Sequence, residues 1–352
     1  MSRLAFLDWT RGIAVLVMIQ CHAFNAFTRA DLRGTPAYVF SQFVGGMAAP
    51  LFLLLAGATF AFQMDKLDRS NALLGPRLLK LLKRGGYVLL LAYLFRLSNT
   101  LSRFPHPVWS TLWKVDILNS MGAGMILLSL LTLAPSRVRA QVACLAGLAI
   151  ASASPLVRSL DWSGVLPQVA EYFVPNPARF PLFPYSAYVS FGIAAGLVIR
   201  RTPRERLERA LEWGALLGFV MMVGAQYFSN LPFSLYEKVD FWIDSPALVI
   251  IKTGICWMTL AGGFLWTEYL VRPKAGWVQV FGKTSLLVYW VHVMIVYGLL
   301  AEAWGGKLTV LQTTAGTALV IVLMVGLAYA RLWQKDWWTA RAAPRQKPVM
   351  TA

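Results

Sequence analysis

The sequence predicts an all-α fold, a polytopic membrane helix bundle of about ten transmembrane helices with both the N- and C-termini in the cytoplasm. Of the 352 residues, 57% are hydrophobic and only 14% are charged, whereas a soluble domain is typically about 25% charged. The apolar residues gather in ten stretches, and the basic residues concentrate in alternate connections between them. These three observations together exclude an ordinary soluble domain.

The ten stretches contain no Asp, Glu, Lys or Arg, and most approach the roughly 20 residues that a spanning helix needs. In order they are 12–28, 34–64, 85–95, 117–136, 140–157, 180–199, 213–236, 253–267, 284–301 and 308–330. The third and the eighth reach spanning length only if Arg96 and Lys252 lie within them. Those two side chains either snorkel to the outer interface or line a polar cavity.

The charge distribution predicts the topology. With the N-terminus inside and ten spans, most of the 33 Lys and Arg residues fall in cytoplasmic connections, as the positive-inside rule requires. The net charge of +17 then reflects loops facing anionic lipid, and no nucleic-acid partner is expected. We predict one transmembrane domain over residues 1–340 and a basic disordered cytoplasmic tail over 341–352.

Two further features limit the interpretation. The first apolar segment ends without a small-residue cleavage site, so we expect it to remain as a membrane anchor rather than act as a signal peptide. The cysteines Cys21, Cys144 and Cys256 each lie in an apolar run and have no metal-ligand spacing. We therefore expect them to be small hydrophobic residues of lipid-embedded helices, and we expect no bound metal.

Ionisable side chains inside the predicted spans are few, and each is costly to bury without a partner. They are His22, Arg96, Asp116, Lys252 and His292, with Asp8 and Arg11 at the inner end of the first helix. Counting about 1.5 Å per residue along the helices places the first five in the middle-to-outer part of the membrane. A shared polar cavity would satisfy them, although an aspartate can serve as a helix N-cap and a histidine as a hydrogen-bonding residue between helices.

Several sequence blocks carry a resemblance. Arg3, Asp8, Arg11 and Gly12, followed by an apolar helix that ends in His22, match the pattern R-x3-4-D-x-x-R-G. Further matching blocks are 45–57, 183–188, 281–292 and the D-x-L-x-x-x-G region that begins at Asp116. The chain thereby resembles transmembrane acyltransferases, in particular the bacterial relatives of heparan-α-glucosaminide N-acetyltransferase. In the lysosomal enzyme the catalytic histidine belongs to a loop after the first helix, so the role of His22 follows the bacterial members and the more distant O-acyltransferases of surface polysaccharides.

The resemblance implies a multi-pass protein of the bacterial inner (plasma) membrane. It implies transfer of an acyl group, typically acetyl, from a cytoplasmic acyl-CoA to a hydroxyl or amine of a sugar-like acceptor on the outer side. Acetyl-CoA would then be a donor substrate, the partners would be membrane lipid, acyl-CoA and a glycan-like acceptor, and we keep a homodimer as a candidate assembly.

Acyl transfer from a thioester requires a base, and a histidine with an unperturbed pKa of about 6.5 suits this role near neutral pH. His22 would be this base, or would accept the acyl group itself. His292 or Asp116 would orient the ring or bind the acceptor, and Asn119 would support a developing oxyanion. The candidate contacts for the CoA phosphates are Arg11, Lys80, Lys83, Arg84 and Lys283, although the run from Lys80 to Arg84 is by default a topology signal.

Two other classes of function remain open at this point. A proton-coupled transporter or flippase would also bury His, Asp and Lys side chains, but many transporters show an internal repeat and none is visible in this sequence. A structural or regulatory membrane protein without catalysis is the third class, and the presence of His22 argues against it.

Overall fold

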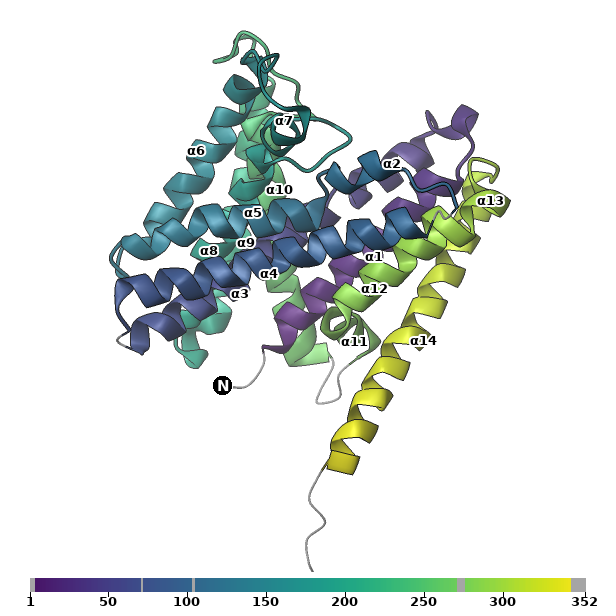
Figure 1. Ribbon diagram of the computed structural model, residues 1–352. Coiled ribbons are helices and arrows are strands. Elements are labelled where there is room, and N and C mark those ends of the chain that lie inside the picture. Colours follow the sequence, from purple (N-terminus) through teal and green to yellow (C-terminus); the bar gives the residue numbers. More distant parts are fainter. Residues whose placement is uncertain (1–3, 71, 103–104, 271–275, 343–352) are drawn as a thin grey trace, which may run out of the picture. The chain divides into compact units, whose positions relative to one another are not determined.

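The structure, a computed structural model, describes residues 4–70, 72–102, 105–270 and 276–342. Within these ranges the chain is helical and forms no β-strand apart from an isolated bridge between Thr28 and Leu308. The longer helices (Figure 1) are α1 (Ala5–Phe27), α2 (Pro36–Gly45), α3 (Ala48–Arg69), α4 (Leu74–Leu101), α5 (Ile117–Leu128), α6 (Arg139–Ser159), α8 (Leu182–Arg201), α9 (Arg204–Ser229), α10 (Pro246–Leu265), α12 (Ser285–Met294) and α14 (Val310–Ala342). Short helices α7 (Pro167–Phe173), α11 (Trp277–Lys283) and α13 (Ala301–Trp304) connect them. The predicted all-α polytopic helix bundle is confirmed.

Each of the ten predicted stretches coincides with a helical segment. Among the described residues, seven segments are long and apolar enough to cross a membrane, and an eighth qualifies if the bent pair α11–α12 counts as one span. The other two stretches lie in α1 and α4, which are 23 and 28 residues long but carry polar and basic side chains along their length. The number of crossings and the side on which each terminus lies stay predictions.

The chain divides into two compact units, which we describe separately. Unit 1 comprises Met1–Thr10 and Gly46–Arg272, and unit 2 comprises Arg11–Gly45 and Pro273–Ala352. Helix α1 therefore contributes its first turns to unit 1 and the remainder to unit 2. The predicted domain boundary at residue 340 stays a prediction, because α14 runs to Ala342 and residues 343–352 of the predicted tail lie outside the described residues.

In unit 1, helix α8 packs tightly against α3 through glycines. A Cβ added to Gly192 would overlap the carbonyl oxygen of Leu54, and one added to Gly196 would lie 2.5 Å from the carbonyl oxygen of Ala58. Glycine permits this close approach of two backbones, and small residues are typical of helix interfaces in membranes. Helix α8 is consequently buried along most of its length.

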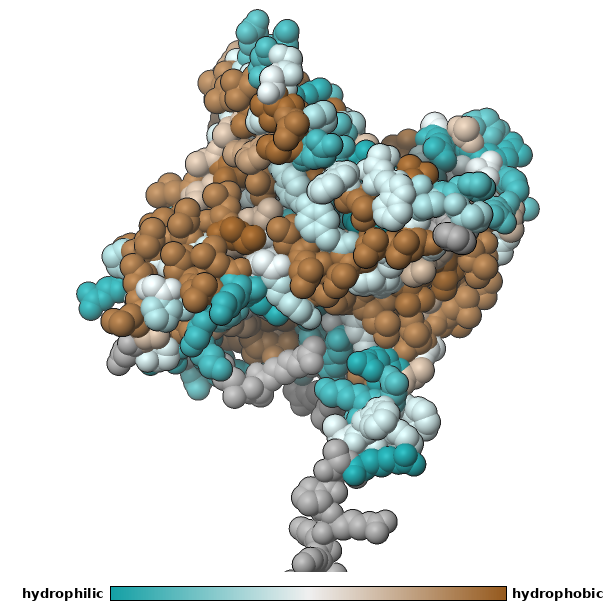
Figure 2. Space-filling model, viewed as in Figure 1, coloured by the Kyte–Doolittle hydropathy of each residue, from teal (hydrophilic) through white to brown (hydrophobic). Residues whose placement is uncertain are grey.

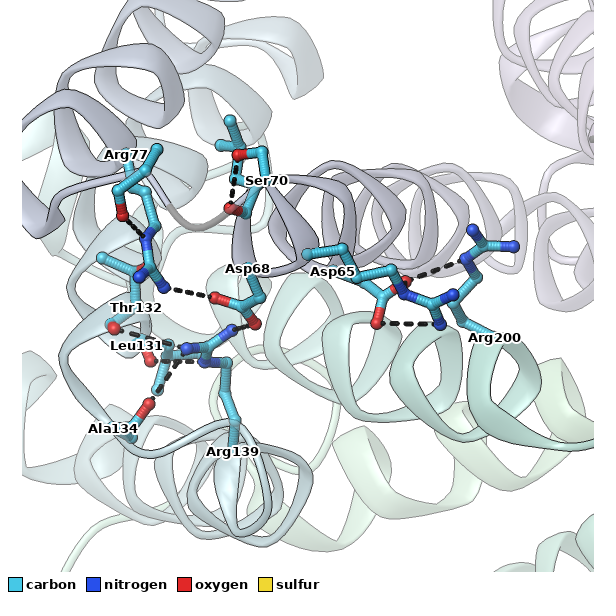
Figure 3. Close-up of polar contacts among 12 residues, drawn as sticks. Asp65, Asp68, Ser70, Arg77, Leu131, Thr132, Ala134, Arg139 and Arg200 are labelled. Atoms are coloured by element: carbon cyan, nitrogen blue, oxygen red, sulfur yellow. Dashed lines mark hydrogen bonds and ion pairs between the residues drawn. The ribbon is translucent and has the colours of Figure 1, made fainter.

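A buried arginine ties the ends of several unit 1 helices together (Figure 3). Arg139, at the start of α6, is 2% exposed and pairs with Asp68 of α3, which also pairs with Arg77 of α4 at 2.9 Å. The Arg139 guanidinium also donates to the carbonyl oxygens of Leu131, Thr132 and Ala134 at 3.0, 3.3 and 3.0 Å. A buried charge is tolerated when its donors are paired in this way.

A second pair lies beside the first. Asp65 of α3 accepts from Nε of Arg200 of α8 at 3.0 Å and also pairs with Arg69. Helices α3 and α8 are therefore joined by an ion pair as well as by glycine packing. The ion pair lies at the ends that the positive-inside rule predicts to be inside.

The hydropathy of the surface agrees with a membrane environment. In Figure 2 the side chains over α6 are mostly hydrophobic, whereas the C-terminal turns of α14 are hydrophilic. Exposed residues on α6 include Leu145, Leu148 and Leu156. Apolar side chains outnumbering polar ones on an outward helix face are expected where the neighbour is lipid.

In unit 2 the predicted stretch 284–301 corresponds to α12 and the helical turns that follow it, and a sharp bend separates α12 from α11. Helices α11 and α12 meet at an angle of 86° at Thr284, and α12 continues through a π-helical turn, Ile295–Leu299, into α13. The hydroxyl of Thr284 donates to the carbonyl oxygen of Val280 at 2.9 Å. The mean hydropathy of the segment reports only its apolar length and does not reveal this bend.

Candidate functional site

Two histidines that are 270 residues apart in the sequence meet within unit 2. His22 lies in the last two turns of α1, and His292 lies near the end of α12. Nδ1 of His22 is 2.9 Å from Nε2 of His292, and the two rings are stacked with centroids 5.1 Å apart. His292 is fully buried, whereas His22 is partly exposed. The predicted proximity of these two side chains is confirmed.

The hydrogen bonds of the pair determine where its protons lie. Nδ1 of His292 is 2.7 Å from the carbonyl oxygen of Val288, and a carbonyl can only accept, so this nitrogen carries a hydrogen. In the neutral ring, Nε2 of His292 is then an acceptor, so that Nδ1 of His22 must donate to it. The remaining nitrogen of His22, Nε2, keeps its lone pair and has no hydrogen-bond partner in the described part of the chain. The tautomers follow from the network, as they must where hydrogens are not observed.

Backbone contacts at both ends of α1 hold it against the C-terminal part of the chain. Leu308 donates to the carbonyl oxygen of Phe27 at 2.9 Å and accepts from the amide of Arg29 at 3.0 Å. Farther down the helix, Gly12 packs on the backbone of Val278 so closely that a Cβ would overlap its carbonyl group. The position of His22 thus depends on packing at two points, one on each side of it along α1.

A π-helical turn follows directly after His292. Tyr297 lies in this turn, and its ring packs edge-on against His22 with centroids 5.5 Å apart. Isolated π-helical turns are rare in helices and are frequent at functional sites. The sequence did not single out Tyr297 or the Val288 carbonyl. The carbonyl could have been inferred only from the four-residue spacing between Val288 and His292.

Asp116 and Asn119 belong to unit 1 and form the N-terminal cap of α5. Oδ1 of Asp116 accepts from the amides of Leu118 and Asn119 at 2.9 and 3.2 Å, and the Asn119 side chain accepts from the amide of Asp116 at 3.2 Å. Oδ2 of Asp116 lies 3.1 Å from Nε of Arg96. Asp116 is therefore a helix N-cap, which is one of the roles that the sequence leaves open for it. It also forms an ion pair with Arg96.

The amide nitrogen of Asn119 points to a different partner. Nδ2 donates to the hydroxyl of Tyr172 at 3.0 Å, and this hydroxyl is 2.8 Å from the hydroxyl of Tyr93. Asn119 therefore orients a pair of tyrosines in unit 1. No role in oxyanion stabilisation is needed to explain its hydrogen bonds.

The basic candidates for binding phosphates are divided between the two units. Lys80, Lys83 and Arg84 lie on the exposed face of α4 in unit 1, and Lys283 is exposed at the end of α11 in unit 2. These four side chains form no ion pair among the described residues, and so their charges are available to a ligand. Arg11, also in unit 2, is partly buried.

Fold and site together define a polytopic helical membrane protein that carries a histidine whose Nε2 has no partner among the described residues. A family model described as "Heparan-alpha-glucosaminide N-acetyltransferase, catalytic" matches residues 3–230. Because the match covers well over half of the 352 residues, the chain belongs to this family. A search of the curated proteins found no match. The family supports a multi-pass membrane protein with an acetyltransferase-like function; the matched residues include His22 and end before His292.

Proposed function

We propose that the protein is a membrane-embedded acyltransferase that moves an acetyl group from cytoplasmic acetyl-CoA to a hydroxyl or amine of a sugar-like acceptor on the outer side. The observation that carries the proposal is the His22–His292 pair, because it leaves Nε2 of His22 unprotonated and without a partner. Membership of the family supports the acetyl group and the sugar class of the acceptor. The bacterial inner membrane is the location we propose.

The chemical step uses this nitrogen as the base. As the acceptor oxygen attacks the thioester carbonyl, Nε2 of His22 takes the hydroxyl proton, and the new C–O bond forms while the C–S bond breaks. The proton then passes to the departing sulfur, so that free CoA leaves with a thiol. His292 acts as a positioning residue, since it accepts the hydrogen of Nδ1 and stabilises the positive charge that develops on the His22 ring.

The CoA phosphates require positive charge. We propose two separate sets of candidate contacts, Arg11 and Lys283 in unit 2 and, by themselves, Lys80, Lys83 and Arg84 in unit 1. The exposure of the four lysine and arginine side chains outside the membrane core supports this assignment. The thioester itself needs no metal in this scheme.

The test uses the full chain in lipid nanodiscs with radiolabelled acetyl-CoA and a methyl glucosaminide as acceptor. We expect acetyl transfer by the wild type, and a loss of at least about 100-fold in His22→Ala, which is the usual minimum contribution of a general base. The matched control is His106→Ala, which replaces the third histidine, in the 102–116 connection, and should leave the rate unchanged.

Two outcomes would contradict the proposal. Retention of wild-type activity in His22→Ala would exclude the base, and acceptor flux across liposomes without any turnover of acetyl-CoA would favour a transporter. Incubation with labelled acetyl-CoA alone, followed by denaturation, separates direct transfer from an acyl-histidine intermediate, because only the latter leaves label on the chain.

A further inference from the structure

A cavity of about 370 Å³ lies in unit 1 between α4, α5 and α7. Four aromatic rings line it, those of Tyr93, Trp113, Tyr172 and Phe173, and the exposed amide of Gln168 lies at its edge. Trp113 packs edge-on against Tyr93 with centroids 6.4 Å apart. The volume falls within the range of small-molecule sites, which are mostly apolar with a few placed polar groups.

In the hydrogen-bond network of Asn119, Tyr172 and Tyr93, one hydroxyl hydrogen has no acceptor among the described residues. The Asn119 amide has a defined orientation, because its oxygen accepts from the Asp116 backbone, and so its nitrogen must donate to the Tyr172 hydroxyl. The Tyr93 and Tyr172 hydroxyls share one hydrogen between them. Whichever of the two donates, the other hydroxyl hydrogen has no acceptor among the described residues. Both tyrosines line the cavity, so this O–H is available to a ligand.

The group that donates stays protonated. Burial, followed by the hydrogen bond with Tyr93, raises the pKa of the Tyr172 phenol above its ordinary value. The cavity therefore presents neutral donors and aromatic faces. Among the residues that the structure describes, no charged side chain lines it, which disfavours a phosphate or a carboxylate as its ligand.

We propose that this cavity binds a hexopyranose unit of the acceptor, with an apolar face of the sugar ring on Trp113, a ring oxygen or hydroxyl accepting from the tyrosine pair, and Gln168 contacting a further hydroxyl. A sugar ring has both features that the cavity complements, C–H faces and hydroxyl edges, whereas a lipid chain would leave the spare O–H and the amide unpaired at a cost. Helix α7 lies in the connection that the charge distribution places on the outer side, where the proposed acceptor is. The inference rests on the proposed function in one respect, that the bound sugar is the acceptor of the acetyl group.

Direct binding tests the cavity without acyl transfer. Methyl α-glucosaminide is titrated into the full chain in nanodiscs and followed by saturation-transfer NMR of the sugar protons. We expect Trp113→Ala to weaken binding about tenfold, a factor that corresponds to the roughly 1.4 kcal/mol within reach of a single aromatic contact, and Trp113→Phe to retain most of the affinity. Tyr172→Phe removes the hydroxyl that Asn119 holds and that orients Tyr93, so the remaining Tyr93 hydroxyl loses its fixed position and binding should weaken severalfold.

Trp109→Ala is the matched control. Trp109 lies in the same short helical turn, Trp109–Trp113, is similarly exposed and does not line the cavity, so its replacement should leave the affinity unchanged. Equal weakening by both tryptophan variants, or unchanged binding in Trp113→Ala and Tyr172→Phe, would overturn the site.

The two proposals fail separately. If the wild type binds the sugar in a Trp113-dependent way but transfers no acetyl group to it, the enzymatic function falls and the sugar site stands. If acetyl transfer to the glucosaminide proceeds with an unchanged KM in Trp113→Ala and in Tyr172→Phe, the sugar site falls and the function stands.

Discussion

His22 has no polar partner on its own helix that could orient its ring through Nδ1. That role is taken by His292, whose own orientation depends on the backbone carbonyl of Val288 one turn earlier. A backbone carbonyl thus orients the ring of His292, and His292 orients the ring of His22. In other sites too, a second group orients a base in this way. At the scale of the residue, the orientation of the His22 ring therefore depends on an acceptor at the position of His292 Nε2.

This dependence predicts a difference between two substitutions. His292→Ala removes the acceptor, and we expect kcat for acetyl transfer to fall about 10- to 100-fold, as is usual for the loss of an orienting partner. His292→Gln can place its amide oxygen near the same position and should recover a large part of the loss. The readout is kcat and its pH profile, since loss of the acceptor also changes the basicity of His22, and a purely structural role would leave the profile unchanged.

His106→Ala again provides the control. A kcat for His292→Ala equal to that of the wild type, or a His292→Gln variant no better than His292→Ala at equal thermal stability, would show that His292 does not orient the base.

At the scale of elements, unit 1 is organised by contacts that hydropathy does not report. Glycines bring α8 against α3, and Arg139 joins the start of α6 to the end of α3 and to the turn that follows α5. In the sequence Arg139 stands between two apolar stretches, a position that the positive-inside rule counts as a topology signal. It is instead almost completely buried, with Asp68 as its counter-ion.

Replacement of this arginine should destabilise unit 1. Arg139→Met removes the donor to one oxygen of Asp68 and to the carbonyls of Thr132 and Ala134, whereas the Leu131 carbonyl still accepts from the amide of Ala134. We expect a loss on the order of 3 kcal/mol, as for other buried pairs that lose one partner. The measurement is the midpoint of thermal unfolding in detergent. Arg137→Met changes an exposed arginine two residues earlier and should shift the midpoint little; equal midpoints for the two variants would show that the buried contacts contribute nothing.

At the scale of the whole molecule, the predicted topology assigns each connection to one side of the membrane. In a variant whose three cysteines are replaced by alanine, Ser163→Cys tests the connection between α6 and α8, and Glu205→Cys tests the start of α9; both positions are exposed. A membrane-impermeant maleimide should label the first in intact cells and the second only after permeabilisation, because the basic residues favour the cytoplasm.

Labelling of both positions from the same side would show that the number of crossings between them is even. The predicted arrangement of ten spans with both termini inside would then be wrong, although the helical fold would not be affected.

The helical fold and the family could be predicted because they depend on local patterns. Apolar runs of spanning length identify the helices, and the block from Arg3 to His22 is a contiguous motif. The break at Thr284 could not be predicted in the same way, since hydropathy reports the apolar length of a segment and not the angle between its parts. The candidate site was predicted in part: His22 and His292 are rare ionisable residues in apolar runs, which made them visible.

The sequence by itself determined that this is a multi-pass helical membrane protein of an acetyltransferase family with a histidine late in its first helix, because composition, periodicity and contiguous motifs are written locally along the chain. Only the tertiary structure decided that His292 is the partner of His22, that Asn119 orients Tyr172, and that Asp116 faces Arg96. These pairings join side chains on different helices, and which side chains meet depends on how the helices pack, a property that no single segment contains.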